Sequence, residues 1–369
     1  MRMKRIGIAG LAALAAVLLV STALAGPHRT RNVVLIVTDG LRWQEVFSGA
    51  DPSLLNDKAG GSWTPTEELK KQYWNDDPRE RRRMLMPFLW NTVARDGQIY
   101  GNREAGSKAE VTNGLWFSYP GYNEMASGVP DPRIDKNEFG PNPNQTVFEW
   151  LNAQPDLAGK VEIFGSWSVF HDIFNDARSH LPVRSGATLV DATDRSPRGQ
   201  LLLELYRTTT RLEGDDPLDS FVYEALKQHL KKHHPRVLFV GFGDTDNWAH
   251  MGRYDAVLDT AHHVDGFVGA LWRQMQAMPE YRGTTTFIIT TDHGRGGGLT
   301  EWKEHGVEEA GSGNIWIAVL GPDTAALGER KNVALVTQAQ IAATVAAFVG
   351  HDYQAAKAAA AAPLPVLGR

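Results

Sequence analysis

Four acidic residues closely follow short apolar runs that are rich in β-branched residues, and we predict these runs to be buried strands. They are Asp39 after residues 32–38, Asp244 and Asp246 after residues 236–243, and Asp292 after residues 284–291. In parallel α/β sheets, ligands bind beyond the carboxyl ends of the strands. A single Asp after a strand is more often a turn former or a helix cap. The convergence of three strand ends is therefore what indicates a site.

Histidines accompany two of these acidic positions. His250 lies four residues after Asp246, so on a helical turn both side chains point the same way. His293 directly follows Asp292, and His305 comes shortly afterwards. Oxygen and nitrogen ligands from Asp and His suit zinc or manganese, and the chain has no cysteine to offer a thiolate. These residues are therefore candidate metal ligands.

A serine begins the segment Ser118-Tyr119-Pro120-Gly121-Tyr122. A serine placed before a Pro-Gly turn, at the start of a possible helix, can expose its hydroxyl. Backbone N–H groups at such a helix start can also face an anion. Most segments of this kind are simple turns, so Ser118 is a candidate nucleophile only in combination with the residues above.

Strands alternate with helical patterns along the chain, which predicts the elements that position these residues. We expect strands at 32–38, 160–164, 236–243, 284–291 and 314–320, and helices at 83–95, 146–152, 218–232, 254–278 and 337–349. This alternation predicts an α/β fold with a mostly parallel sheet covered by helices on both faces. Residues 51–80 and 128–144 break the pattern and are expected to be irregular connections. No linker divides the chain, so we expect one main domain, residues 26–353.

The two ends of the chain differ from this domain. Positive charges, an uncharged apolar run and Ala23-Leu24-Ala25 indicate a signal peptide over residues 1–25. An uncleaved membrane anchor is the alternative, but the apolar run is shorter than the ~20 residues that a span needs. We therefore expect a periplasmic or secreted protein without a stable membrane anchor after cleavage. Residues 354–369 are mostly Ala and Pro, and we expect a poorly ordered tail.

Composition excludes several classes of protein. Hydrophobic residues make up 42% and charged residues 22%, which rules out a disordered chain. The formal net charge is −5, so no nucleic-acid-binding surface is evident. The absence of cysteine excludes disulfides and a cysteine nucleophile.

The order of these motifs resembles that of the alkaline phosphatase superfamily, which includes nucleotide pyrophosphatases/phosphodiesterases and sulfatases. The matching pieces, in the family order, are Asp39-Gly40, Ser118 to Gly128, Asp246 to His250, Asp292 to Gly294 and His305-Gly306. The resemblance covers residues 32–322. It implies a three-layer α/β/α sandwich and an enzyme that hydrolyses small phosphate or sulfate esters.

The resemblance also implies roles for individual residues. One metal ion would be held by Asp39, Asp292 and His293, with the Ser118 oxygen as a further ligand. A second ion would be held by Asp246, His250 and His305; Asp244 is the alternative to Asp246, whose distance to His250 fits the motif better. Zinc is favoured for the two divalent ions, and manganese, magnesium and calcium are alternatives. Ser118 would be the catalytic nucleophile of a phosphatase or phosphodiesterase.

The sequence also departs from the family patterns. Sulfatases carry Cys/Ser-x-Pro-x-Arg, and here Tyr122 stands in place of the Arg that maturation of the first residue normally requires. A sulfuric ester hydrolase is therefore the alternative, and a noncatalytic binding protein on the same fold is another. Asn113 and Arg295 are candidate donors to a substrate oxygen, although ordinary loop or surface structure explains both equally well.

Overall fold

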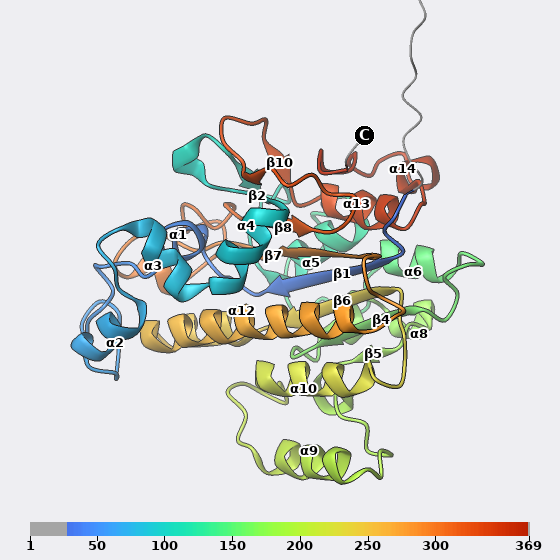
Figure 1. Cartoon of the computed structure of the whole chain (residues 1–369), viewed down its shortest axis with the longest axis horizontal. Helices are drawn as coiled ribbons and strands as arrows, with labels where there is room; N and C mark the ends of the chain where they lie inside the picture. The colour runs from blue at the N-terminus through green and yellow to red at the C-terminus, as the bar shows by residue number, and fades with distance from the viewer. Residues whose placement is uncertain (1–27, 368–369) are drawn as a thin grey trace, which may run out of the picture.

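The computed structural model describes residues 28–367, and an eight-stranded sheet runs through the middle of this part of the chain (Figure 1). Its strands are β1 (Asn32–Thr38), β2 (Gln98–Tyr100), β4 (Val161–Gly165), β5 (Val183–Arg184), β6 (Val237–Phe242), β7 (Thr285–Thr290), β8 (Ile317–Leu320) and β9 (Gly328–Glu329). Their order in the sheet is β5-β4-β6-β1-β7-β8-β2-β9. The five strands from β5 to β7 are parallel, whereas β8 is antiparallel to both of its neighbours. The sheet is therefore mostly parallel, as predicted.

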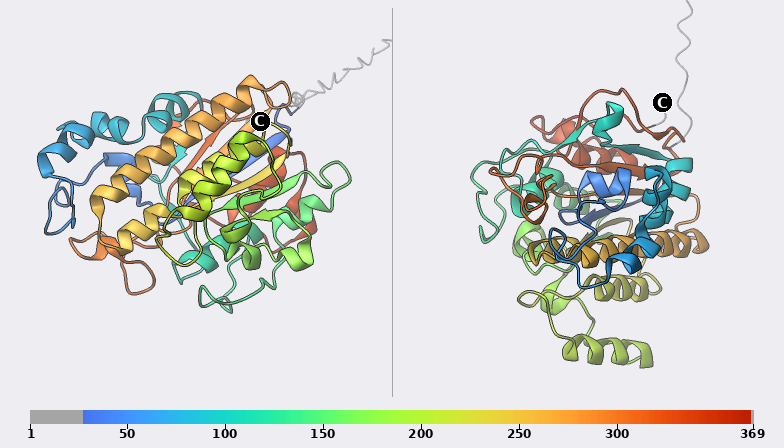
Figure 2. Two further views of the ribbon diagram at one scale, coloured as in Figure 1. Left: turned by 90° about the horizontal axis from the view of Figure 1, so that it is seen from below. Right: turned by 90° about the vertical axis from the view of Figure 1, so that its left-hand side faces the viewer.

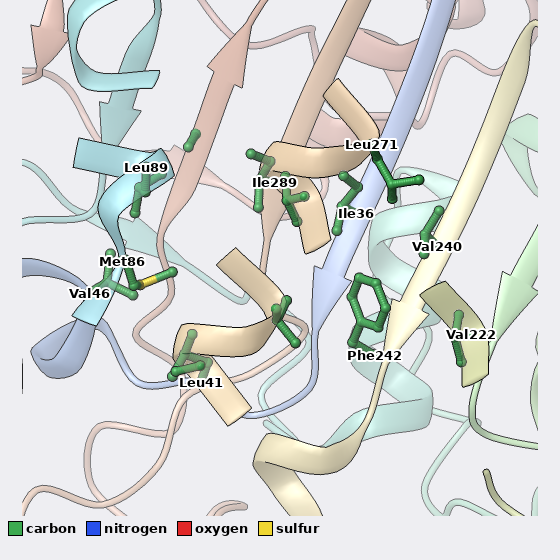
Figure 3. Packing of buried hydrophobic residues seen from close by; sticks show 14 of the residues in the cluster. Ile36, Leu41, Val46, Met86, Leu89, Val222, Val240, Phe242, Leu271 and Ile289 are labelled. Atoms are coloured by element: carbon green, nitrogen blue, oxygen red, sulfur yellow. The ribbon is translucent and has the colours of Figure 1, made fainter. Parts of the chain in front are cut away.

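The central strands are buried along their whole length, which explains why their sequences are almost continuously apolar. Ile36 of β1 is in register with Val240 of β6 on one side and with Ile289 of β7 on the other. Figure 3 shows these three side chains beside Leu271 in one layer of the core. The predicted strands at 32–38, 236–243 and 284–291 are thus confirmed to within a residue or two at their ends.

Helices cover both faces of the sheet (Figure 2). Val34 and Ile36 pack into the cluster on one face, while Val33 and Leu35 pack into the cluster on the other. The first face is covered by α1 (Trp43–Ser48), α3 (Pro78–Leu85), α10 (Asp219–His229) and α12 (Tyr254–Ala277). The second is covered by α5 (Ser118–Ser127), α6 (Val147–Asn152), α7 (Phe170–Ile173) and α13 (Gln340–Phe348). The predicted three-layer α/β/α sandwich is therefore confirmed.

Shorter elements complete this part of the chain. The remaining helices are α2 (Thr66–Tyr73), α4 (Ala94–Asp96), α8 (Asp176–Ser179), α9 (Pro197–Thr208), α11 (Asp244–His250) and α14 (Tyr353–Ala356). Single turns form at Leu89–Val93, Arg103–Ala105, Gly186–Thr188 and Glu301–Lys303. A second sheet pairs β3 (Ala109–Glu110) with β10 (Val336–Thr337). Within residues 28–367, no helix is both long and apolar enough to cross a membrane.

Two connections differ from the expectation. The helix expected at 83–95 is interrupted: α3 ends at Leu85, and helical turns resume at Leu89. Pro87 explains the break, since a proline disfavours helical backbone at the residue before it. The stretch 51–80 is not wholly irregular, because it contains α2 and the start of α3. Residues 129–145 contain no helix or strand, as expected.

The Ala/Pro-rich tail is ordered as far as Leu367, which corrects the expectation of a poorly ordered segment. Leu364 and Val366 are buried in the core beneath α13. The Leu364 N–H donates to Thr344 Oγ1 at 2.8 Å, and Leu367 bridges to Thr324. Burial of the Leu364 and Val366 side chains stabilises the position of this segment, although its Ala/Pro-rich composition is typical of a disordered tail. The domain therefore extends beyond residue 353, while the predicted signal peptide lies outside the described residues.

Candidate metal centre

The carboxyl ends of β1, β6 and β7 bring the predicted ligands to one edge of the sheet. Asp39 follows β1, α11 follows β6 directly, and Asp292 follows β7. Gly40 adopts φ +59°, and a Cβ atom there would lie 2.8 Å from Asp246 Oδ1. A glycine after Asp39 is therefore needed both for the left-handed turn and for the close approach of α11.

One group of donor atoms combines α11 with the segment after β7. His250 Nε2 lies 3.3 Å from Asp246 Oδ2 and 3.0 Å from His305 Nε2. His305 Nε2 lies 3.7 Å from Asp246 Oδ1. Ligand atoms about 2.1 Å from one tetrahedral ion are about 3.4 Å apart, so these spacings match the edges of such a site.

A second group lies beside the first. His293 Nε2 is 3.2 Å from Asp39 Oδ1, 3.5 Å from Asp292 Oδ2 and 3.3 Å from Ser118 Oγ. Each distance is of the size found between two ligands of one ion. The residues here whose donor atoms all lie within 4.8 Å of one another are Asp39, Asp246 and His293. The Asp246 carboxylate stands between the groups, because its Oδ1 is 3.9 Å from His293 Nε2.

Unpaired buried atoms support a cation at this position. Asp39 Oδ1 and Asp292 Oδ2 are buried without a hydrogen-bond partner in the described chain. Burial and the neighbouring Asp39 charge raise the pKa of Asp292 well above its ordinary value. Two close carboxylates in a dry environment favour a positive charge beside them, which a bound cation or the protonated His293 imidazole can supply. The residues present therefore fit divalent metal ions, and their oxygen and nitrogen donors suit zinc.

The two histidines beside Asp39 and Asp246 differ in charge state. Burial alone would lower the pKa of His293, but the carboxylates of Asp292 and Asp39 raise it to about 9. Burial lowers the pKa of His305 strongly, and the charges of His293 and Arg295 lower it further. His305 is thus a neutral imidazole ready to bind a metal, whereas His293 must first lose a proton.

Ser118 is the first residue of α5, which places its hydroxyl at the amino end of a ten-residue helix. The residue two before it, Trp116, has φ +57°, an unusual conformation for a large side chain. The turn directs Ser118 Oγ toward His293 Nε2. The N–H of Tyr119 donates to Asn137 Oδ1 at 3.0 Å, so Asn137 stands beside the serine. Strain of this kind often marks a functional turn.

A cavity of about 140 Å³ opens over both groups of donors. Asp39, Ser118, Asp246, His250 and His305 all line it. The structure thus gathers five of the seven predicted ligands on the cavity wall, with Asp292 and His293 buried directly behind them.

Sequence reasoning missed Asn137, which also lines the cavity. Nothing in the sequence singles it out, because it lies in the Pro-rich connection after α5. Its Oδ1 accepts the Tyr119 N–H, so its amide N–H groups can donate to a bound anion.

Arg295, a candidate donor to a substrate oxygen, is not among the described residues that line the cavity. Its guanidinium is buried, donates to Asp246 Oδ1, and also donates to the Lys303 carbonyl at 2.5 Å. Burial lowers the pKa of Arg295 to about 9, while the nearby Asp39 charge favours the protonated form. Arg295 is therefore placed to hold the carboxylate of the candidate ligand Asp246.

Asn113 and Asp244 make their hydrogen bonds outside the two groups of candidate ligands. Asn113 Oδ1 accepts the N–H groups of Leu115 and Trp116, so this side chain shapes the turn before the serine. Asp244 Oδ2 accepts the N–H of Asp219 at 2.9 Å, at the start of α10. Of the two acidic candidates after β6, the structure places Asp246 and not Asp244 beside His250.

Comparisons with known proteins agree with this fold. No family model matches the sequence, and no curated protein matches it. Wild-type alkaline phosphatase PafA superposes with a TM-score of 0.59 at 8% identity, covering 92% of this chain and 99% of that one. A phosphonate monoester hydrolase from Silicibacter pomeroyi gives 0.53 at 13% identity, covering 91% and 76%. A 2-O GAG sulfatase gives 0.51 at 13% identity, covering 87% and 71%.

These likenesses are at low identity and concern the fold. All three structures belong to the alkaline phosphatase superfamily. The chain therefore has the alkaline phosphatase-like fold, which confirms the resemblance predicted from the order of its motifs.

Proposed function

We propose that this protein is a metal-dependent hydrolase of phosphoric esters with Ser118 as its nucleophile and with one divalent ion at each ligand group. The observation that carries the proposal is the position of Ser118 Oγ, 3.3 Å from His293 Nε2 at the wall of the cavity. A serine hydroxyl is a weak nucleophile unless a base or a metal activates it. Here the Ser118 hydroxyl lies beside the candidate metal ligand His293, so a bound cation could activate it.

The residues divide the chemistry between them. Bound cations would favour the serine alkoxide and offset charge on the departing oxygen. Ser118 loses its hydroxyl proton to solvent, its Oγ forms a bond to phosphorus while the bond to the ester oxygen breaks, and the alcohol leaves with a proton from solvent. Water then hydrolyses the phosphoserine and restores the hydroxyl. The amino end of α5 and the Asn137 amide favour negative charge on the remaining phosphoryl oxygens.

Zinc is the proposed ion at both groups, with manganese, magnesium or calcium as alternatives. The proposed site of action is the periplasm or the exterior of the cell, and this part rests on residues 1–25 alone. Comparing the amount of protein in the medium, the periplasm and the cytoplasm, with and without those residues, tests export.

Sulfuric ester hydrolysis is the second candidate, because a sulfatase shares the fold and Ser118 precedes a proline by two residues. Tyr122 argues against it: this residue occupies the position of the maturation arginine, is buried, and donates to Asp39 Oδ2 at 3.1 Å. A formylglycine at position 118, found by mass spectrometry, would reverse this ranking.

Metal analysis combined with an ester panel tests the proposal. We expect about two divalent ions per chain and release of p-nitrophenol from p-nitrophenyl phosphate or its bis ester, abolished by a chelator and restored by zinc. Sulfate ester turnover in their place would establish the second candidate. Absence of metal and of turnover, even with added zinc or manganese, would leave a noncatalytic binding protein.

Replacement of the nucleophile tests its role separately. Ser118→Ala should lower kcat by at least about a thousandfold while both metal ions remain bound. Ser127→Ala is the matched control, because Ser127 lies at the other end of α5 and its hydroxyl contacts the Val129 carbonyl. Wild-type turnover in Ser118→Ala would reject the serine mechanism.

A further inference from the structure

The wall of the cavity also carries negative charge outside the two groups of candidate ligands. Glu213 and Asp216, from the connection between α9 and α10, line the cavity together with Trp167, and we call this part of the lining the outer wall. Among the described residues that line it, none is a lysine or an arginine. An anion at the metal ligands would therefore have carboxylates, and no basic side chain, facing its outer part.

Asp216 is held in place and lies in a negative environment. Its Oδ1 accepts the Ser168 N–H at 2.9 Å, which fixes the carboxylate beside Trp167. Burial raises the pKa of Asp216 to about 6, and the charges of Glu213 and Asp215 act in the same direction. Near neutral pH this carboxylate is ionised at a cost that a cationic neighbour would relieve.

Trp167 lines the same cavity as Glu213, Asp216 and five of the candidate ligands. It is half-buried, and its ring centroid lies 6.2 Å from that of Tyr122, whose hydroxyl donates to Asp39. Trp167 thus neighbours Tyr122, which contacts the candidate ligand Asp39. It also precedes Ser168, whose N–H holds Asp216. An aromatic face combined with carboxylates is the combination that proteins use to bind ammonium and quaternary ammonium groups.

Resting on the function proposed above, we propose that the natural substrate is an ester of a cationic alcohol. Its anionic ester group lies at Ser118 and the ligand groups, and its ammonium group lies between Trp167 and the carboxylates of Glu213 and Asp216. The three ligand carboxylates do not fully neutralise two divalent ions, so the cavity floor is positive while its outer wall is negative. A zwitterionic substrate matches both ends, whereas an alcohol that carries a phosphate or carboxylate is repelled by the outer wall.

Two isosteric esters test this inference with the metal-loaded protein. The p-nitrophenyl phosphodiesters of choline and of 3,3-dimethylbutanol have the same shape and differ by one positive charge. We expect kcat/KM to be about tenfold higher for the choline ester, from the cation–aromatic contact and the partly exposed carboxylates together. In the double variant Glu213→Gln/Asp216→Asn this ratio should fall to within about twofold of one.

Asp215→Asn is the matched control. It removes one negative charge from the same connection, where the double variant removes two, but Asp215 does not line the cavity, so the ratio should remain close to that of the wild type. In Asp216→Asn the side chain keeps an oxygen that can accept the Ser168 N–H, which preserves the local turn. An equal loss of the ratio in the control variant would show that net charge, and not the cavity wall, sets the preference.

Binding measurements separate this inference from the proposed function. Calorimetry on Ser118→Ala compares phosphocholine with 3,3-dimethylbutyl phosphate, and tighter binding of phosphocholine supports the cationic site even if no ester is hydrolysed. Equal kcat/KM values and equal affinities for the charged and neutral isosteres would overturn the inference while leaving an active hydrolase in place.

Discussion

The guanidinium of Arg295 donates to Asp246 Oδ1, on the carboxylate that stands between the two groups of candidate ligands. Arg295 is buried, and its Nε has no partner in the described chain. The contact supplies a positive charge to Asp246 from the side opposite the cavity. Arg295 and any bound cations would therefore act on the same partly buried carboxylate.

Replacement of Arg295 should consequently have an effect that depends on the metal. In Arg295→Met the free energy of unfolding of the chelated protein should fall by about 3 kcal/mol, because the partly buried Asp246 carboxylate loses its ion pair with a buried guanidinium. With zinc bound the loss should be clearly smaller. Urea unfolding of both proteins with and without zinc measures the difference, and equal losses in the two states would contradict it.

The two acidic residues after β6 should behave differently on substitution. Asp246→Asn should lower the number of bound ions per chain, since this carboxylate reaches both ligand groups. Asp244→Asn should keep the metal content, because Asp244 contacts the start of α10 and an amide oxygen can still accept the Asp219 N–H. Elemental analysis distinguishes them. Loss of metal in Asp244→Asn alone would reverse our assignment.

Metal affinity should rise with pH below about 9. His293 carries a proton there in the metal-free protein, because Asp292 and Asp39 hold its pKa at about 9 against the effect of burial. Binding must release that proton, so zinc affinity should increase by up to about tenfold per pH unit. Competition against a zinc chelator at pH 6.5 and 7.5 measures the trend. Calorimetry in buffers of different ionisation enthalpy counts the released protons, and a count of zero would refute the explanation.

Stability should also depend on pH through Asp265, away from the metal ligands. Burial raises the pKa of Asp265 to about 7, although its carboxylate accepts the N–H groups of Phe88 and Leu89. The folded protein therefore keeps this proton to higher pH than the unfolded chain does. This contribution to stability is present below about pH 4 and is lost as the pH rises to about 7, by up to about 1.4 kcal/mol per unit.

Asp265→Asn isolates this contribution. Urea unfolding of the chelated wild type and variant at pH 5, 6, 7 and 8 should show a shallower decline in the variant. Identical slopes in the two proteins would mean that Asp265 is ionised in the folded state throughout this range.

The fold was largely predictable because its signals are local. Residues 32–38 and 285–290 are two short segments rich in β-branched residues, which is typical of a strand buried on both faces of a sheet. The sequence of α12 repeats apolar residues at helical spacing. The edge strands β5 and β9 were missed, since two residues carry no periodicity. The order of the tail was also missed, because it depends on a cavity that other segments provide for Leu364 and Val366.

By itself, the sequence determined which residues could bind metal, because a strand that ends in Asp and the spacing from Asp246 to His250 are properties of neighbouring residues. Only the tertiary structure decided that Arg295 supports Asp246 instead of facing the cavity. It also placed Asn137 beside Ser118, and Glu213 and Asp216 on the outer wall. Those relationships join segments far apart in the chain, and they arise from how loops pack over the edge of the sheet. No periodicity or local propensity encodes such packing.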